Sequence, residues 1–232
     1  MMLASEAAMQ AEIIAVGSEL LLGQIVDTDS AFIAREFVDL MEKGKNPTVG
    51  TLAHLGQVDI RIAAKGADAA DADRMIEPVE AEIRQRLGDI VFGVDDYTLE
   101  GRITTRLREG GARVAVAERL ATGAAEGFAG GVILVRRDEA RRLTGDVEAT
   151  GSAQERAERL AEAVRKWSGV EIGLATVFED VPDTTPPVTV VGIAVALAGR
   201  RAGREHRLGG DRPSLRIRTA TLALDLLRRS LP

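Results

Sequence analysis

Short apolar runs rich in branched side chains alternate along this chain with segments whose apolar residues recur at helical spacing. The first kind of run predicts buried strands, and the second predicts amphipathic helices. The strands are expected at residues 12–16, 58–64, 89–93, 113–117, 131–135, 170–177 and 188–197, and the helices at 69–87, 98–109, from Ser152 through Trp167, and at 214–229. Such alternation predicts a layered α/β fold.

Charge is distributed unevenly along the chain. Residues 1–100 hold 8 Lys or Arg against 19 Asp or Glu, giving −11, whereas residues 101–232 hold 22 against 17, giving +5. A change of sign between the two halves indicates separate structural units. Because 45% of the residues are hydrophobic, the chain has enough apolar material for packed cores, and disorder is disfavoured.

The composition argues against several classes of site. The chain has no cysteine and two histidines, His54 and His206, so a thiolate site is excluded and a His-based metal site or a Ser-His-Asp triad is disfavoured. Its longest apolar run, Val188 to Ala198, is shorter than the roughly 20 residues of a membrane-spanning helix. The first residues lack the basic segment of a secretory signal. We therefore expect a cytoplasmic protein with no metal, no cofactor and no membrane contact.

The segment AVGSELLLGQIVDTDS begins with a strand that ends at Gly17. Gly17, Ser18 and Glu19 provide main-chain amides, a hydroxyl and a carboxylate after that strand, where open α/β sheets bind ligands. An ordinary strand-to-helix turn explains the same residues, because the segment is neither a Gly-x-Gly-x-x-Gly fingerprint nor a P-loop. Both interpretations stay open on the pattern alone.

Two single side chains have simple interpretations. His54 lies in TVGTLAHLG, which is expected to pair with QVDIRIAAKG as a hairpin, and it is predicted to be structural. Trp167 falls at helical spacing with the apolar residues before it, so it is predicted to lie in the core or at a contact between domains.

Three segments of the chain resemble the CinA family of competence/damage-inducible proteins. AVGSELLLGQIVDTDSAFIARE is similar to the start of the first domain, which itself resembles molybdopterin-binding domains, and the segment from KNPTVGTLAHLG to DIVFGVDD is similar to the small middle domain. The C-terminal domain of the family resembles nicotinamide mononucleotide amidohydrolases. Four segments of this chain are similar to it: RVAVAE, Gly130-Gly131, LGGDR and ALDLLRRSL. Most of the first domain is missing between Leu40 and Lys45, so the chain resembles an internally truncated member.

The resemblance implies an α/β chain in three parts. The parts are a truncated molybdopterin-binding-like N-terminal βα unit over 11–42, a small α+β middle module over 45–97, and a C-terminal amidohydrolase-like α/β sandwich over 98–232.

The C-terminal part departs from the family pattern where the chemistry is expected. After its first strand the family has Ala-Glu-Ser-Cys-Thr-Gly-Gly, and a tyrosine and a lysine assist further along. The differing positions here are Arg119 for the serine, Val135 for the tyrosine, and Ala140 or Arg141 for the lysine. Amide hydrolysis needs a hydroxyl nucleophile and a group that takes its proton, and a protonated arginine is a poor base.

The residues that persist suit binding. The candidate ligand-binding residues are Gly17, Ser18, Glu19, Glu118, Thr122, Gly123, Gly210, Asp211 and Arg212, and Thr122 and Arg212 are also the candidate catalytic residues. Arginines crowd residues 200–218, and a guanidinium group can hold a phosphate by paired hydrogen bonds. A solvated hairpin and helix face explains the same cluster in a chain with 26 Arg and 4 Lys.

The resemblance implies a role in pyridine-nucleotide salvage, namely hydrolysis of the amide of nicotinamide mononucleotide to the nicotinic acid form and ammonia. The substituted positions predict that this activity is weak or absent here. The alternatives are a catalytically inactive nucleotide-binding or assembly protein on the same scaffold, and a degraded chain with no function of its own. The expected partners are a nucleotide of this kind and further copies of the chain. Nucleic acid is not expected, because the chain is acidic and no aromatic platform accompanies the arginines.

Overall fold

The computed structural model describes residues 9–16, 37–41, 45–54, 56–117, 128–132 and 151–231. The chain divides into two compact units, Met1–Thr98 (unit 1) and Leu99–Pro232 (unit 2). Both combine sheets with helices, so the α/β fold class is confirmed. The boundary at Thr98 agrees with the start of the expected C-terminal part, but the parts expected over 11–42 and 45–97 fall within one unit.

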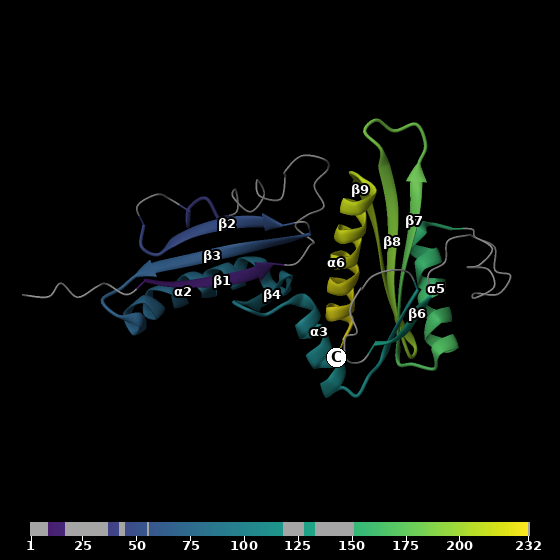
Figure 1. Ribbon diagram of the computed structural model, residues 1–232, viewed down its shortest axis with the longest axis horizontal. Coiled ribbons are helices and arrows are strands. Elements are labelled where there is room, and N and C mark those ends of the chain that lie inside the picture. The colour runs from purple at the N-terminus through teal and green to yellow at the C-terminus, as the bar shows by residue number, and fades with distance from the viewer. Residues whose placement is uncertain are drawn as a thin grey trace, which may run out of the picture. The chain divides into compact units, whose positions relative to one another are not determined.

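Unit 1 is a four-stranded antiparallel sheet with one long helix against it (Figure 1). Its elements are β1 (Met9–Val16), β2 (Thr48–His54), β3 (Gln57–Lys65), α2 (Ala69–Leu87), the short 3₁₀ turn η2 (Gly88–Ile90) and β4 (Val91–Val94). The strand order is β2-β3-β1-β4. The expected hairpin is confirmed as β2 and β3, whereas the last strand starts at Val91 because residues 88–90 form η2.

Strand β1 does not begin a separate N-terminal unit. It pairs with β3 over all eight residues, from Met9 opposite Lys65 to Val16 opposite Val58, and with β4 on its other side. A lone βα unit of about thirty residues cannot bury its own apolar faces, and joining an existing sheet removes that problem. The proposed independent unit over 11–42 is therefore corrected: its strand is an interior strand of the unit 1 sheet.

Residues 37–41 also belong to unit 1. They form a turn in which the main-chain N–H groups of Leu40 and Met41 both donate to the carbonyl of Phe37. The Phe37 side chain is fully buried among the residues of β3 and α2 that form the core of this unit. The middle module thus uses residues that the sequence assigned to the unit before it.

Arg86 of α2 holds this turn in place. Its guanidinium donates two hydrogen bonds to Asp39, at 2.9 and 2.7 Å, and lies 5.6 Å from the centre of the Phe37 ring. A second carboxylate, Glu82, accepts from the same guanidinium. The hydrogen bonds from Arg86 lower the pKa of Asp39 to about 2.

Helix α2 confirms the expected span of 69–87. It begins where the Asp68 side chain accepts from the N–H of Asp71, and it ends at Gly88, whose φ of 59° is left-handed. The helix continues through Pro78. Its buried residues recur on one face, against the sheet: Ala72, Ile76, Ile83 and Leu87.

Unit 2 is a five-stranded mixed sheet with helices on both faces (Figure 1). Its elements are α3 (Leu99–Glu109), β5 (Val114–Ala117), β6 (Phe128–Val132), α5 (Ala153–Ser168), β7 (Ile172–Val181), β8 (Val188–Leu197), β9 (Arg200–Gly209) and α6 (Arg212–Ser230). The order is β6-β5-β7-β8-β9, with β5 parallel to β6 and β7, and β8 antiparallel to both its neighbours.

Strand β9 was not predicted from the sequence. Its residues were assigned to an arginine-rich hairpin and helix face, because four exposed arginines obscure the buried positions Gly203, His206 and Leu208. The strand pairs with β8 along its whole length, from Val188 opposite Gly209 to Leu197 opposite Arg200. Arginines are suited to such an edge, because charge discourages the pairing of edges between molecules.

Helix α5 lies directly against a floor of glycine and alanine on one face of the unit 2 sheet. A Cβ atom on Gly173 would lie 2.0 Å from the carbonyl oxygen of Ala161, and one on Gly192 would lie 2.0 Å from that of Ala153. The alanines Ala175, Ala194 and Ala196 complete this floor. A capping box of Ser152 and Glu155 starts the helix. No side chain larger than hydrogen fits at Gly173 or Gly192 while the helix keeps this distance.

Helix α6 covers the opposite face, and its C-terminal end is held by guanidinium groups. Arg200 of β9 donates to the carbonyl of Ser230, and Arg106 of α3 donates to that of Arg228 at 3.1 Å. These bonds satisfy carbonyls that have no partner within the helix. Nearby, the buried carboxylate of Asp225 accepts from Arg228 and Arg229 of the same helix.

Trp167 differs from its expected place. Its side chain, in the last turn of α5, is 65% exposed, because the α5 face that contacts the floor ends at Val164. His54 has the expected structural contact, with its Nε2 atom 2.9 Å from a carboxylate oxygen of Asp59 on β3. Among the described residues, no helix has the length and apolar character needed to cross a membrane.

Substituting Gly192 tests the glycine floor. We expect Gly192→Ala to lower the free energy of unfolding by about 3 kcal/mol, since the new methyl group meets a main-chain carbonyl that cannot move alone. The matched control is Gly203→Ala on the same face, where the new methyl group meets only the flexible ends of Glu158 and Gln154, at a cost of about 1 kcal/mol or less. Urea unfolding measures both, and equal losses would contradict the floor.

Removing Arg86 tests the attachment of the 37–41 turn. The pKa of Asp39 is about 2 in the folded chain against an ordinary 3.8, so its stabilisation is complete above pH 3.8 and is lost as pH falls through 2. We expect Arg86→Gln to return the pKa of Asp39 toward 3.8 in a carboxyl NMR titration. The control is Arg84→Gln, two residues before Arg86, which removes the ion pair between Arg84 and Glu80. If the pKa of Asp39 were the same in the Arg86 variant as in the unsubstituted chain, this ion pair would be absent in solution.

Candidate functional site

Four strands of the unit 2 sheet run in the same direction, so their carboxyl ends point toward the same edge of the sheet. Strands β5, β6 and β7 are parallel, and β9 runs the same way because β8 is antiparallel to both β7 and β9. In α/β sheets this is the edge where ligands bind. The segments that the sequence analysis singled out in the C-terminal part follow β5 and β9 at this edge.

Most of the predicted site falls on residues that the structure does not describe. The predicted site residues outside the described ranges are Gly17, Ser18, Glu19, Glu118, Thr122 and Gly123. The substituted positions Arg119, Val135, Ala140 and Arg141 lie outside them as well. Gly210, Asp211 and Arg212 are described, and they lead from the end of β9 into α6, of which Arg212 is the first residue.

The register of the sheet separates the ends of β5 and β9. Ala117, the last residue of β5, is opposite Ala175 of β7, whereas Gly209, the last residue of β9, is level with Val181 through β8. Six residues of β7 separate these levels, about 20 Å at the rise of a strand. The chain therefore does not bring Gly210, Asp211 and Arg212 next to the end of β5.

Gly210 and Asp211 build the start of α6. Gly210 has a φ of 118°, which is open to glycine and strained for other residues. Asp211 is the N-cap, and its carboxylate accepts from the N–H of Ser214 at 2.8 Å. The hydrogen bonds from Ser214 lower the pKa of Asp211. These two predicted ligand-binding residues thus have a structural role in the described contacts.

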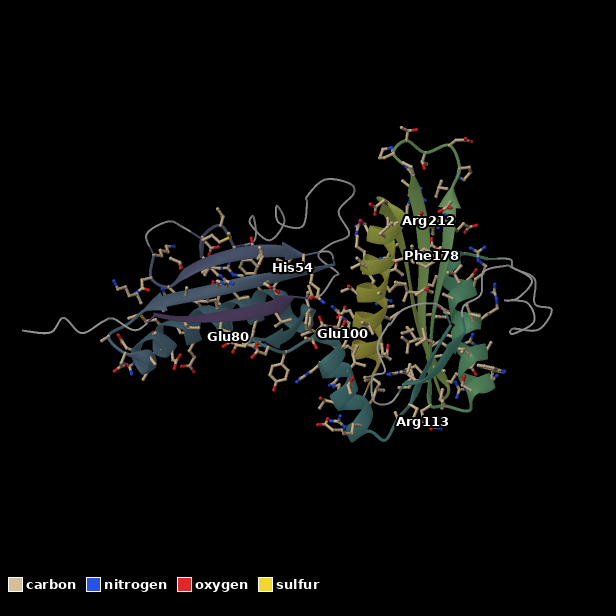
Figure 2. The ribbon with its side chains drawn as sticks, viewed as in Figure 1. His54, Glu80, Glu100, Arg113, Phe178 and Arg212 are labelled. Atoms are coloured by element: carbon tan, nitrogen blue, oxygen red, sulfur yellow. The ribbon has the colours of Figure 1, made fainter. Side chains whose placement is uncertain are left out.

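Arg212 is bound to a carboxylate that the sequence analysis did not single out. Figure 2 labels Arg212, beside the upper part of the unit 2 sheet. Its Nη2 atom lies 2.5 Å from Oδ2 of Asp180, near the end of β7. The other oxygen of Asp180 accepts from the hydroxyl of Thr189 on β8, at 2.9 Å. No local pattern indicates this pair, since 32 residues separate Asp180 from Arg212. The neighbouring carboxylates Glu179 and Asp180 also lie on opposite faces of the sheet.

The other arginines of residues 200–218 include three that donate to main-chain carbonyls. Arg218 donates to Gly209 at 3.0 Å, Arg204 to Gly203 at 3.0 Å, and Arg200 to Ser230. These contacts favour the interpretation of a solvated strand and helix face for those three. Arg212 differs from them, because its partner is a carboxylate and a carboxylate competes with anionic ligands.

His206 is the one buried histidine of the described residues. Burial lowers its pKa and the neighbouring positive charge of Arg204 lowers it further, so the imidazole is neutral near pH 7. Within the described ranges, no group of three or more His, Cys, Asp or Glu side chains could hold a metal ion. The described part of the site thus offers guanidinium, carboxylate and hydroxyl groups.

Comparison with family models identifies part of unit 1. Residues 31–93 match the model described as the damage-inducible protein CinA KH domain. The match starts inside the segment 11–42 that the sequence analysis gave to a separate unit. It agrees with the burial of Phe37 in the core of unit 1.

Curated relatives match most of this chain. A CinA-like protein of Kosmotoga olearia is 30% identical over 218 residues, covering 86% of this chain and 53% of that protein. A CinA-like protein of Frankia casuarinae is 34% identical over 212 residues, covering 84% and 49%. The chain thus spans about half the length of the curated relatives that it matches.

Solved structures share part of the fold. A competence-damaged protein (CinA) superfamily protein of Klebsiella pneumoniae is 20% identical, with a TM-score of 0.50 over 57% of this chain and 95% of that one. A superfamily protein of Enterobacter cloacae is 17% identical, with a TM-score of 0.51 over 60% and 96%. At these identities the likeness concerns the fold.

The cap role of Asp211 can be separated from a ligand role. We expect Asp211→Ala to lower the free energy of unfolding by about 1 kcal/mol, because the N–H of Ser214 loses its acceptor. Asp211→Asn keeps an acceptor oxygen and is expected to retain most of that stability. Because the pKa of Asp211 is lowered on folding, the charged part of its stabilisation is present above pH 3.8 and is lost as pH falls below it. Equal stability of all three chains in urea would rule out the cap.

Proposed function

Because the chain belongs to the CinA family, we propose that unit 2 binds a pyridine nucleotide through its phosphate, as a salvage-type protein resembling nicotinamide mononucleotide amidohydrolases. The observation that carries this proposal is the guanidinium of Arg212, exposed at the end of β9 and paired with a displaceable surface carboxylate. A guanidinium is matched to phosphate in charge and in the spacing of its donors.

Amide hydrolysis is proposed to be weak or absent in this chain. Arg119 stands at the serine position, so the hydroxyl that would attack the amide is missing there. Thr122 is the nearest other hydroxyl in that segment, and no lysine or tyrosine stands at the assisting positions. Loss of several groups that act together removes most of a rate enhancement.

Unit 1 is proposed to act in assembly rather than in nucleic-acid binding. KH domains clamp a nucleic-acid backbone with a Gly-x-x-Gly loop, and residues 31–93 contain no such segment. Asp68, the N-cap of α2, and Asp71, in the first turn of that helix, carry charges that repel phosphates. A homo-oligomer with a small nucleotide as ligand remains our expectation for the partners.

Calorimetry and an ammonia assay test the proposal together. Nicotinamide mononucleotide is expected to bind the chain and to release no ammonia above the rate without protein, whereas ordinary enzymes turn over at about 1 s⁻¹ or faster. Arg212→Ala is expected to lose binding at least tenfold. Arg216→Ala, which removes an exposed arginine one turn further along α6, is the control. Turnover at an ordinary rate, or unchanged binding by Arg212→Ala, would refute the assignment.

A further inference from the structure

The exposed pair of Arg212 and Asp180 joins two elements that lie far apart in the sequence. The side chains are 65% and 59% exposed, so solvent and solutes reach both. An exposed ion pair of this kind contributes little to stability. The pair matters more for ligand binding, because an N–H donor of the Arg212 guanidinium is already bonded to a carboxylate of the chain itself.

The carboxylate of Asp180 is held toward Arg212 by the strands beneath it. Thr189 is buried on β8, and its hydroxyl donates to Oδ1 while Oδ2 accepts from Arg212. The preceding residue, Glu179, lies on the other face of β7, where Arg156 of α5 donates to it at 2.7 Å. The two adjacent carboxylates thus bind arginines of different helices: Glu179 binds α5, and Asp180 binds α6.

We propose that Asp180 is an internal ligand of Arg212 that an incoming phosphate must displace, so that Asp180 determines which anions this site accepts. The proposal deepens the nucleotide-binding function and rests on it for the identity of the ligand. A tethered carboxylate competes at an effective concentration in the millimolar range or above. Free carboxylates offer the same charge and geometry without the tether, so they bind poorly. A dianionic phosphate monoester brings twice the charge and more acceptor oxygens, and it is the class that displaces Asp180.

Displacement leaves no carboxylate buried without a partner. Asp180 keeps its hydrogen bond from Thr189 and is more than half exposed to water. The neighbouring carboxylate of Asp211 does not replace it on Arg212, because Asp211 accepts from the N–H of Ser214. The exchange at Arg212 is therefore between Asp180 and an external anion.

The test is a titration of isotopically labelled full chain with inorganic phosphate and, separately, with acetate. The signals of the Gly210 and Ser214 amides and of the Arg212 side-chain N–H report binding. Asp180→Asn is expected to bind phosphate about fivefold more tightly than the unsubstituted chain and to gain measurable acetate binding. Glu179→Gln is the matched control, because it removes an equal charge from the adjacent residue on the opposite face, and it is expected to change neither affinity.

Two further variants complete the test. Thr189→Val removes the hydroxyl that anchors Asp180, and it is expected to give a smaller gain in phosphate affinity than Asp180→Asn. The double variant Asp180→Asn with Arg212→Ala is expected to lose the gain. An equal gain in Glu179→Gln, no gain in Asp180→Asn, or a gain that survives loss of Arg212 would each overturn the proposal. If Asp180→Asn gains phosphate while no variant binds nicotinamide mononucleotide, the internal ligand stands and the nucleotide assignment fails.

Discussion

The close contact between α5 and the unit 2 sheet is the constraint on which the rest of that unit depends. Gly173 and Gly192 allow main-chain carbonyls of the helix to lie where a Cβ atom would otherwise be. The helix therefore covers β7 and β8 at short range, mostly with alanine, together with Leu160 and Val164. Close packing of this kind leaves the main-chain polar groups paired, because the sheet and the helix satisfy their own main-chain hydrogen bonds.

The length of β7 and β8 then decides where the candidate site lies. Both strands have ten residues, and they extend beyond the end of β5 before α6 begins. This extension places Asp180 and Thr189 beside the first residues of α6, and it separates that place from the end of β5. The proposed anion site therefore lies at the start of α6.

Local signals predicted much of the fold. Helix α2, the capping box of α5 and the β2–β3 hairpin follow from periodicity, caps and turn residues that lie within twenty residues of one another. The place of β1 does not follow from such signals, because its partners β3 and β4 are more than forty residues away. The sequence does not predict strand β9, because its apolar positions are few and four of its five exposed positions are arginines.

The candidate site was predicted in part for the same reason. Arg212 was identified from its resemblance to a family motif, but its charge partner is Asp180, which no local pattern connects to it. Asp211, a predicted ligand-binding residue, caps α6 by accepting from the N–H of Ser214. A motif indicates which residues matter, and the tertiary contacts determine which of them are free to bind.

We expect a nucleotide phosphate to take the place of Asp180 on Arg212. A crystal structure of the chain soaked with nicotinamide mononucleotide would measure this. The phosphate is expected within hydrogen-bond distance of the Arg212 guanidinium, with Asp180 turned away from it and still bonded to Thr189. A nucleotide bound elsewhere with the Arg212–Asp180 pair intact would contradict it.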